Sequence, residues 1–132
     1  MCGKTPKVSK TFGVYSYMQK LEPIQPGKTY RIVQLGNGDE PLFFEQANKF
    51  YFMQLLFKHL DPVCKIVDFD LQEHRIALVL KFREANEIPE KYGDKLYQPL
   101  SNLLNSYAKS INKRYDRKGS LFRRRFDRIE IL

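Results

Sequence analysis

VCKIVDFDLQEHRIALVLKF, residues 63–82, is the stretch that decides the fold. Residues 63–70 and 75–82 are rich in β-branched, aromatic and other apolar side chains, a composition that is typical of strands. A short polar link, Gln72-Glu73-His74, separates them. Because a short link of this kind joins neighbouring strands that run in opposite directions, the sequence predicts an antiparallel β-hairpin.

Upstream of this hairpin the pattern predicts one strand and one helix. Residues 30–35 are β-rich and follow a turn at Pro26-Gly27, and residues 36–39 form a second turn signal before the next element. Residues 45–59 carry apolar side chains at helical spacing, and Asp61-Pro62 ends that helix. The apolar side chains that suggest this helix are Phe50, Met53, Leu56 and Phe57.

Downstream, residues 84–95 are polar and predict a connecting loop, and residues 97–115 give the clearest helix in the chain. Pro99 fits the first turn of this helix, and its apolar residues fall close to one face. These apolar residues are Leu100, Leu103, Leu104, Tyr107, Ile111 and Tyr115. Residues 121–131 alternate apolar side chains imperfectly with arginines, which predicts a last strand.

The predicted order is strand, helix, strand, strand, helix, strand. This order is typical of an α+β, ferredoxin-like fold, in which an antiparallel sheet carries its helices on one face. The sequence divides into an N-terminal arm, residues 1–29, and a single domain, residues 30–132. Within the arm, residues 15–21 have the pattern of one helical turn.

Charge is concentrated near the end of the chain. The net charge is +8, and residues 101–132 hold nine lysines and arginines against three acids. Such a local excess favours a polyanionic partner, although a solvated face kept charged for solubility is the simpler alternative. No apolar run approaches the ~20 residues that span a bilayer, so we expect no membrane partner. Two isolated cysteines, Cys2 and Cys64, make a disulfide framework improbable and favour a reducing, cytoplasmic location.

The basic segment supplies the candidate DNA-binding residues. Its cations would grip phosphates, Asn112 would read a base edge or cap the backbone, and Tyr115 would stack on a base. Phe122 and Phe126 would either stack on unpaired bases or pack in the core. The candidate DNA-binding residues are Lys109, Asn112, Lys113, Arg114, Tyr115, Arg117, Lys118, Arg123, Arg124, Arg125 and Arg128.

Two stretches carry a family resemblance. One is GKTYRIVQLGNG, residues 27–38, followed by PLFFE at residues 41–45; the other is NSYAKSINKRYDRKGSLF, residues 105–122, running on to Arg125-Phe126. Together they resemble the REP-associated tyrosine transposases, which belong to the insertion-sequence-200-like, single-tyrosine HUH transposases. The resemblance covers roughly residues 27–132.

The resemblance implies a ferredoxin-like fold, recognition of imperfect DNA hairpins and, in many members, a homodimer. Active members cleave single-stranded DNA through a phosphotyrosine intermediate. Their chemistry needs a His-hydrophobic-His strand that holds Mg²⁺ or Mn²⁺, and a nucleophilic tyrosine on a later helix.

This sequence departs from that pattern at the catalytic positions. Arg75 and Ala77 stand where the two histidines belong, and neither side chain can bind a cation. His74 lies one residue too early, so it would face the other side of the strand. The nucleophile helix of the family has no counterpart in residues 1–132, and Tyr107 falls on an apolar helix face, which favours core packing. We therefore expect DNA binding without strand cleavage, no catalytic residue and no metal cofactor.

Three alternatives stay open at this point. The chain could be an active or formerly active transposase whose nucleophile helix lies beyond Leu132, or a decayed element with no present role. It could also be an RNA-binding module with the same sheet topology. An RNA-recognition motif would need its aromatic signature on a central strand, and residues 75–82 carry none.

Overall fold

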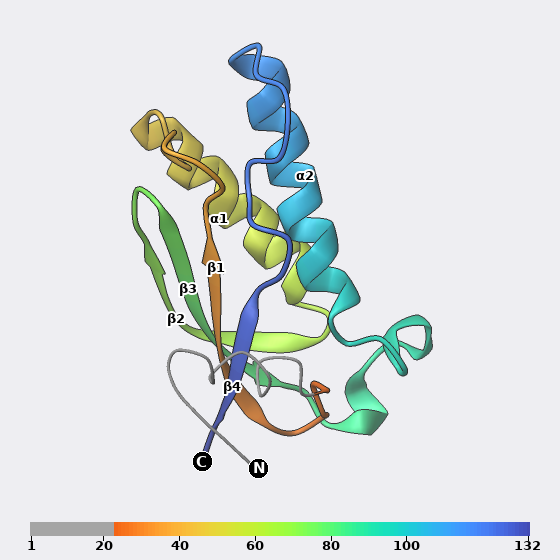
Figure 1. Ribbon diagram of the computed structural model, residues 1–132. Coiled ribbons are helices and arrows are strands. Elements are labelled where there is room, and N and C mark those ends of the chain that lie inside the picture. The colour runs from red at the N-terminus through yellow and green to blue at the C-terminus, as the bar shows by residue number, and fades with distance from the viewer. Residues whose placement is uncertain (1–22) are drawn as a thin grey trace.

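The computed structural model describes residues 23–132, so residues 1–22, with the predicted helical turn and Cys2, lie outside the described residues. Within this range the elements follow the predicted order (Figure 1). They are β1 (Thr29–Leu35), α1 (Gln46–Leu60), β2 (Cys64–Leu71), β3 (Arg75–Phe82), α2 (Gln98–Arg114) and β4 (Asp127–Ile131). The predicted loop at residues 84–95 contains two 3₁₀ turns, Ala85–Glu87 and Glu90–Tyr92.

The four strands form one sheet in the order β2-β3-β1-β4, and each neighbouring pair is antiparallel. Helices α1 and α2 pack side by side against the same face of this sheet (Figure 1). The predicted ferredoxin-like α+β fold and the β2–β3 hairpin are therefore confirmed. No helix within residues 23–132 is long and apolar enough to cross a bilayer.

Strand alternation decides which side chains reach the helices. On the two central strands the even-numbered residues, such as Ile32 and Leu78, are buried beneath α1 and α2. Their odd-numbered neighbours lie on the opposite, open face of the sheet, because successive side chains of a strand point to opposite faces. Arg75 and Ala77, where the resemblance would place histidines, therefore both lie on the open face of the sheet.

Helix α1 forms where the sequence predicts it, but it buries a different set of apolar residues. Phe52, Leu55 and Leu60 face the core together with Leu56, whereas Phe50 and Phe57 are 65% and 48% exposed. Seven residues separate Phe50 from Phe57, so they share a face, but the helix packs on the sheet with another of its apolar faces. Helix α2 behaves as predicted, since Leu100, Leu103, Tyr107 and Ile111 are all buried.

The predicted last strand at residues 121–131 is wrong in its first half. Only Asp127–Ile131 pairs with β1, and Phe122 makes one isolated bridge to Gly36. Between the Gly36–Phe122 and Val33–Asp127 pairs, two residues of β1 face four residues of the incoming chain, 123–126. The two extra residues bulge out of the ladder, as extra residues in an antiparallel pair must.

Candidate nucleic-acid interface

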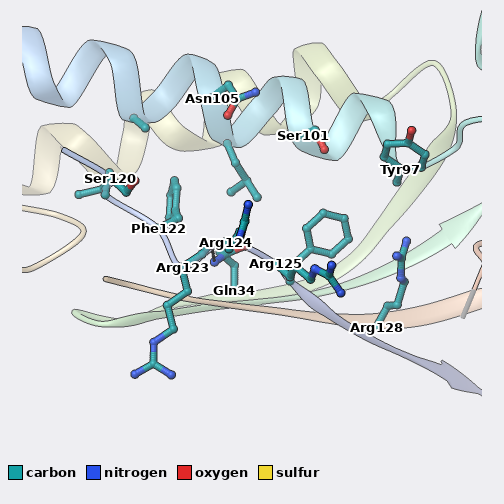
Figure 2. A pocket seen from close by; sticks show the side chains of 14 residues that line it. Gln34, Tyr97, Ser101, Asn105, Ser120, Phe122, Arg123, Arg124, Arg125 and Arg128 are labelled. Carbon is teal, nitrogen blue, oxygen red and sulfur yellow. Dashed lines mark hydrogen bonds between the residues drawn. The ribbon is translucent and has the colours of Figure 1, made fainter. Parts of the chain in front are cut away.

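The bulge at residues 123–126 opens a cavity of about 650 Å³ between α2 and the segment that leads into β4 (Figure 2). This volume lies within the range of ~300–1,000 Å³ that is usual for small-molecule sites. The cavity is bounded by one residue of β1, one face of α2 and residues 120–128. We call it the arginine cavity, because four arginines lie around it.

The floor of the arginine cavity is Gln34, a polar side chain in the buried row of β1. It is 3% exposed, and its amide nitrogen donates to the carbonyl oxygens of Leu35 at 2.9 Å and Arg123 at 3.0 Å. Its Oε1 atom has no hydrogen-bond partner among residues 23–132. Gln34 therefore fixes the bulge with its two amide hydrogens and leaves a bare acceptor at the cavity.

One face of α2 forms a wall of the cavity. Tyr97, Ser101, Asn105 and Ala108 recur at intervals of three and four residues, so they line up along that face. Figure 2 shows Ser101 and Asn105 on the helix, above the bulge. Tyr97, which precedes the helix and is 41% exposed, lies at one end of this row. The wall thus offers hydroxyl and amide groups beside an aromatic ring.

The opposite wall carries the positive charge. Arg124, Arg125 and Arg128 line the cavity with Phe126, and the guanidinium of Arg128 lies 5.3 Å from the centre of the Phe126 ring. Burial, the largest cause, lowers the pKa of Arg128, and the charge of Arg125 acts in the same direction. An arginine stays protonated despite such a shift, so the wall concentrates positive charge against an aromatic surface. In Figure 2 the side chain of Arg123 extends away from the cavity.

Two predicted DNA-binding residues, Arg117 and Asn112, have partners within the chain. The Arg117 side chain is 9% exposed and forms an ion pair with Glu40 at 2.7 Å. It also donates to the side-chain oxygen of Asn112, whose amide donates to Gly119 O at 3.0 Å. Asn112 therefore makes the backbone contact that was one of its two predicted roles. Together these residues fix the turn between α2 and the bulge.

Arg114 and Tyr115 point toward the start of α1, away from the arginine cavity. The Tyr115 ring stacks on Phe44 with centroids 4.4 Å apart, and its hydroxyl donates to the carboxylate of Glu45. Arg114 forms an ion pair with Glu45 at 3.7 Å. The remaining predicted cations, Lys109, Lys113 and Lys118, are exposed and do not line the cavity.

The polar lining of the cavity was not predicted from the sequence. Gln34 was detectable as the one polar residue in the alternating row Tyr30, Ile32, Gln34. Ser101 and Asn105 were detectable as a polar pair four residues apart on α2. None of the three was predicted to be functional, because they line a cavity only once residues 123–126 bulge away from β1.

The two positions where the resemblance would place histidines are Arg75 and Ala77. Arg75 forms an ion pair with Asp70 at 3.5 Å, and its Nε is buried without a hydrogen-bond partner. Ala77 is 8% exposed, and His74 lies 3.7 Å from the carboxylate of Glu73. Within residues 23–132 no group of three or more His, Cys, Asp or Glu side chains could hold a metal ion.

Tyr107 lies in the core, as predicted. It is fully buried, and its hydroxyl donates to Leu42 O at 2.7 Å. Burial, the largest cause, raises the pKa of Tyr107, with Tyr115 and Tyr51 adding to the shift. This environment disfavours the phenolate that a nucleophile must become.

No protein-family model and no curated protein sequence matches this chain. Among solved structures, it is similar to a REP-associated tyrosine transposase bound to a REP hairpin, with a TM-score of 0.62 and 10% sequence identity. The match covers 84% of this chain and 60% of that chain. At this identity the likeness shows a shared fold, and the chain spans about three fifths of the neighbour's length.

Proposed function

We propose that this protein binds hairpin or single-stranded DNA through the arginine cavity and does not cleave it. The observation that carries the proposal is the cavity itself, which combines several arginines, aromatic rings and polar groups at one place. Arginines contact phosphates through charge-assisted bonds, and aromatic side chains stack on unpaired bases. Both kinds of contact suit a strand that is not fully paired.

Two further observations favour a transposase-like DNA-binding domain over an RNA-recognition motif. The fold matches a transposase that is bound to a REP hairpin. An RNA-recognition motif stacks bases on aromatic side chains of its sheet. The open-face residues of the central strands β1 and β3 include no aromatic side chain; they are Thr29, Arg31, Val33, Leu35, Arg75, Ala77, Val79 and Lys81.

We propose that the chain does not cleave DNA because of the chemistry of Arg75, Ala77 and Tyr107. Arg75 is a permanent cation and Ala77 has no ligand atom, so this pair cannot hold the divalent metal that active family members use. Tyr107 is buried and hydrogen-bonded to Leu42 O, which leaves its hydroxyl out of reach of a scissile phosphate.

Fluorescence anisotropy of a labelled DNA hairpin with a single-stranded extension, measured over a salt series, tests the binding proposal. Each neutralised phosphate adds about 0.7–0.9 to the slope of log K against log salt. The double variant Arg124→Gln/Arg125→Gln should weaken binding and lower the slope by about 1.4–1.8. A matched control, Lys58→Gln/Lys91→Gln, removes the same charge from other surfaces and should keep most of the slope. Equal slopes for the two double variants would contradict the proposal.

The same hairpin tests the rest of the proposal. Incubation with Mg²⁺ or Mn²⁺ should leave the strand intact and leave no protein–DNA adduct on a denaturing gel. Competition with an RNA hairpin of the same sequence should show that DNA binds at least as tightly as RNA. Metal-dependent nicking would overturn the inactive assignment, and tighter RNA binding would overturn the DNA assignment.

A further inference from the structure

We propose that the arginine cavity holds one unpaired nucleobase and that Gln34 reads this base through its Oε1 atom. The inference rests on the proposed function and names the part of the ligand that enters the cavity. It starts from a polar side chain that is 97% buried and still has an unused acceptor.

The orientation of Gln34 is fixed by its own hydrogen bonds. Both amide hydrogens are used, by Leu35 O at 2.9 Å and by Arg123 O at 3.0 Å. A flipped amide would place Oε1 against these two carbonyl oxygens, which repel it. Gln34 can therefore present only an acceptor to a ligand, and a ligand that displaces water from Oε1 must supply a donor in its place.

The requirement for a donor selects the part of a DNA strand that enters. A phosphate diester has no hydrogen to donate, and an internal deoxyribose has no free hydroxyl. The remaining donors are the amino and imino groups of the bases. In a duplex the partner base uses the imino hydrogen and one hydrogen of each amino group, and the second amino hydrogen faces a groove. An unpaired base can present all of its donors, and it can enter a cavity between a helix and a strand to reach Gln34.

The surroundings of Gln34 fit such a base. Tyr97, Phe122 and Phe126 all line the cavity and give it aromatic surfaces. Arg124 and Arg125, both exposed, lie where they can contact the phosphates on either side of the inserted nucleotide. The base would thus be held by stacking and one specific hydrogen bond, and its backbone by charge.

An abasic scan of the DNA tests this inference without changing the protein. A hairpin that binds the wild-type chain is prepared with each unpaired nucleotide replaced in turn by an abasic residue, which keeps the phosphates. One position should lose at least tenfold in affinity, and the others much less. At that position a base methylated on its donor nitrogen should reproduce part of the loss. A flat abasic profile would overturn the inference.

A double-mutant cycle assigns the base to Gln34. In the Gln34→Leu variant, which keeps a side chain of similar size, the abasic penalty at the critical position should fall to about threefold or less. The control Gln54→Leu, on the exposed side of α1, should keep the full penalty. An undiminished penalty in a folded Gln34→Leu variant would overturn the assignment.

The methylated-base measurement keeps the test decisive if Gln34→Leu does not fold, because it uses the wild-type protein. Failure of the inference is also distinct from failure of the proposed function. A wild-type chain that binds no hairpin contradicts the proposed function. A chain that binds with salt dependence but without a critical base contradicts only this inference.

Discussion

At the scale of single residues, Tyr107 stabilises the core through both its ring and its hydroxyl. Its ring lies edge-on to Phe52 with centroids 5.1 Å apart, and its hydroxyl bonds to the carbonyl oxygen of Leu42. Tyr107→Phe keeps the ring and leaves that carbonyl unpaired. We expect it to lower the free energy of unfolding by about 1–2 kcal/mol in urea titrations. Tyr92→Phe, at a half-buried tyrosine, should change it by less than about 0.5 kcal/mol.

Arg117 lies in the basic stretch, but its partners within the chain lead us to expect a structural role and no contact with DNA. Its guanidinium is paired with Glu40 and Asn112. We predict that Arg117→Gln lowers the unfolding free energy by about 1–2 kcal/mol, because Glu40 and Asn112 lose their partner. The salt slope of DNA binding by the folded variant should stay unchanged. A slope lowered by about 0.7–0.9, the value for one neutralised phosphate, would make Arg117 a phosphate contact.

At the scale of elements, α1 illustrates how a helix with two apolar faces misleads a periodicity analysis. Phe52 is fully buried, whereas Phe57 is 48% exposed on the same helix. We predict that Phe52→Ala costs about 3–5 kcal/mol of stability through the cavity it leaves. Phe57→Ala should cost about 1 kcal/mol or less. Thermal and urea unfolding of the two variants provide the comparison, and similar losses would contradict the packing of α1 described above.

At the scale of the whole molecule, two buried neutral acids predict a loss of stability in alkali. Burial raises the pKa of Cys64 from 9.0 to about 12, and burial also raises that of Tyr107 above its ordinary 10.0. Groups whose pKa is raised in the folded state contribute stability that is complete below the unfolded pKa and is lost as pH rises. Each should therefore lower the unfolding free energy by up to about 1.4 kcal/mol per pH unit once the pH exceeds its unfolded pKa.

Urea unfolding between pH 7 and pH 11 measures this loss. The variant Cys64→Ala/Tyr107→Phe removes both groups, so its stability should decline less steeply above pH 9 than that of the wild type. Parallel declines would show that other groups, among them the many lysines, determine the alkaline limit.

The sequence by itself determined the order of the elements and most of their extent, and its charge favoured a polyanionic partner. Local composition fixes strands and helices, and the excess of lysine and arginine near the end of the chain needs no tertiary contact to be recognised. That Arg75 and Ala77 stand where the resemblance would place histidines is likewise visible in the sequence alone. The buried face of α2 was also predictable, because its apolar residues leave only one face to bury.

Only the tertiary structure decided which of the basic residues share a site. Whether Arg117 is a free cation or a paired one depends on Glu40, which lies 77 residues away. The shortened β4 and its bulge depend on how residues 123–126 meet the end of β1, since a one-strand pattern carries no information on the register of its partner. The contact of residues 123–126 with the end of β1 also places Gln34 at the floor of a cavity, where a polar side chain in a buried row is explained. These features arise from pairing between distant segments, and local sequence patterns do not specify such pairing.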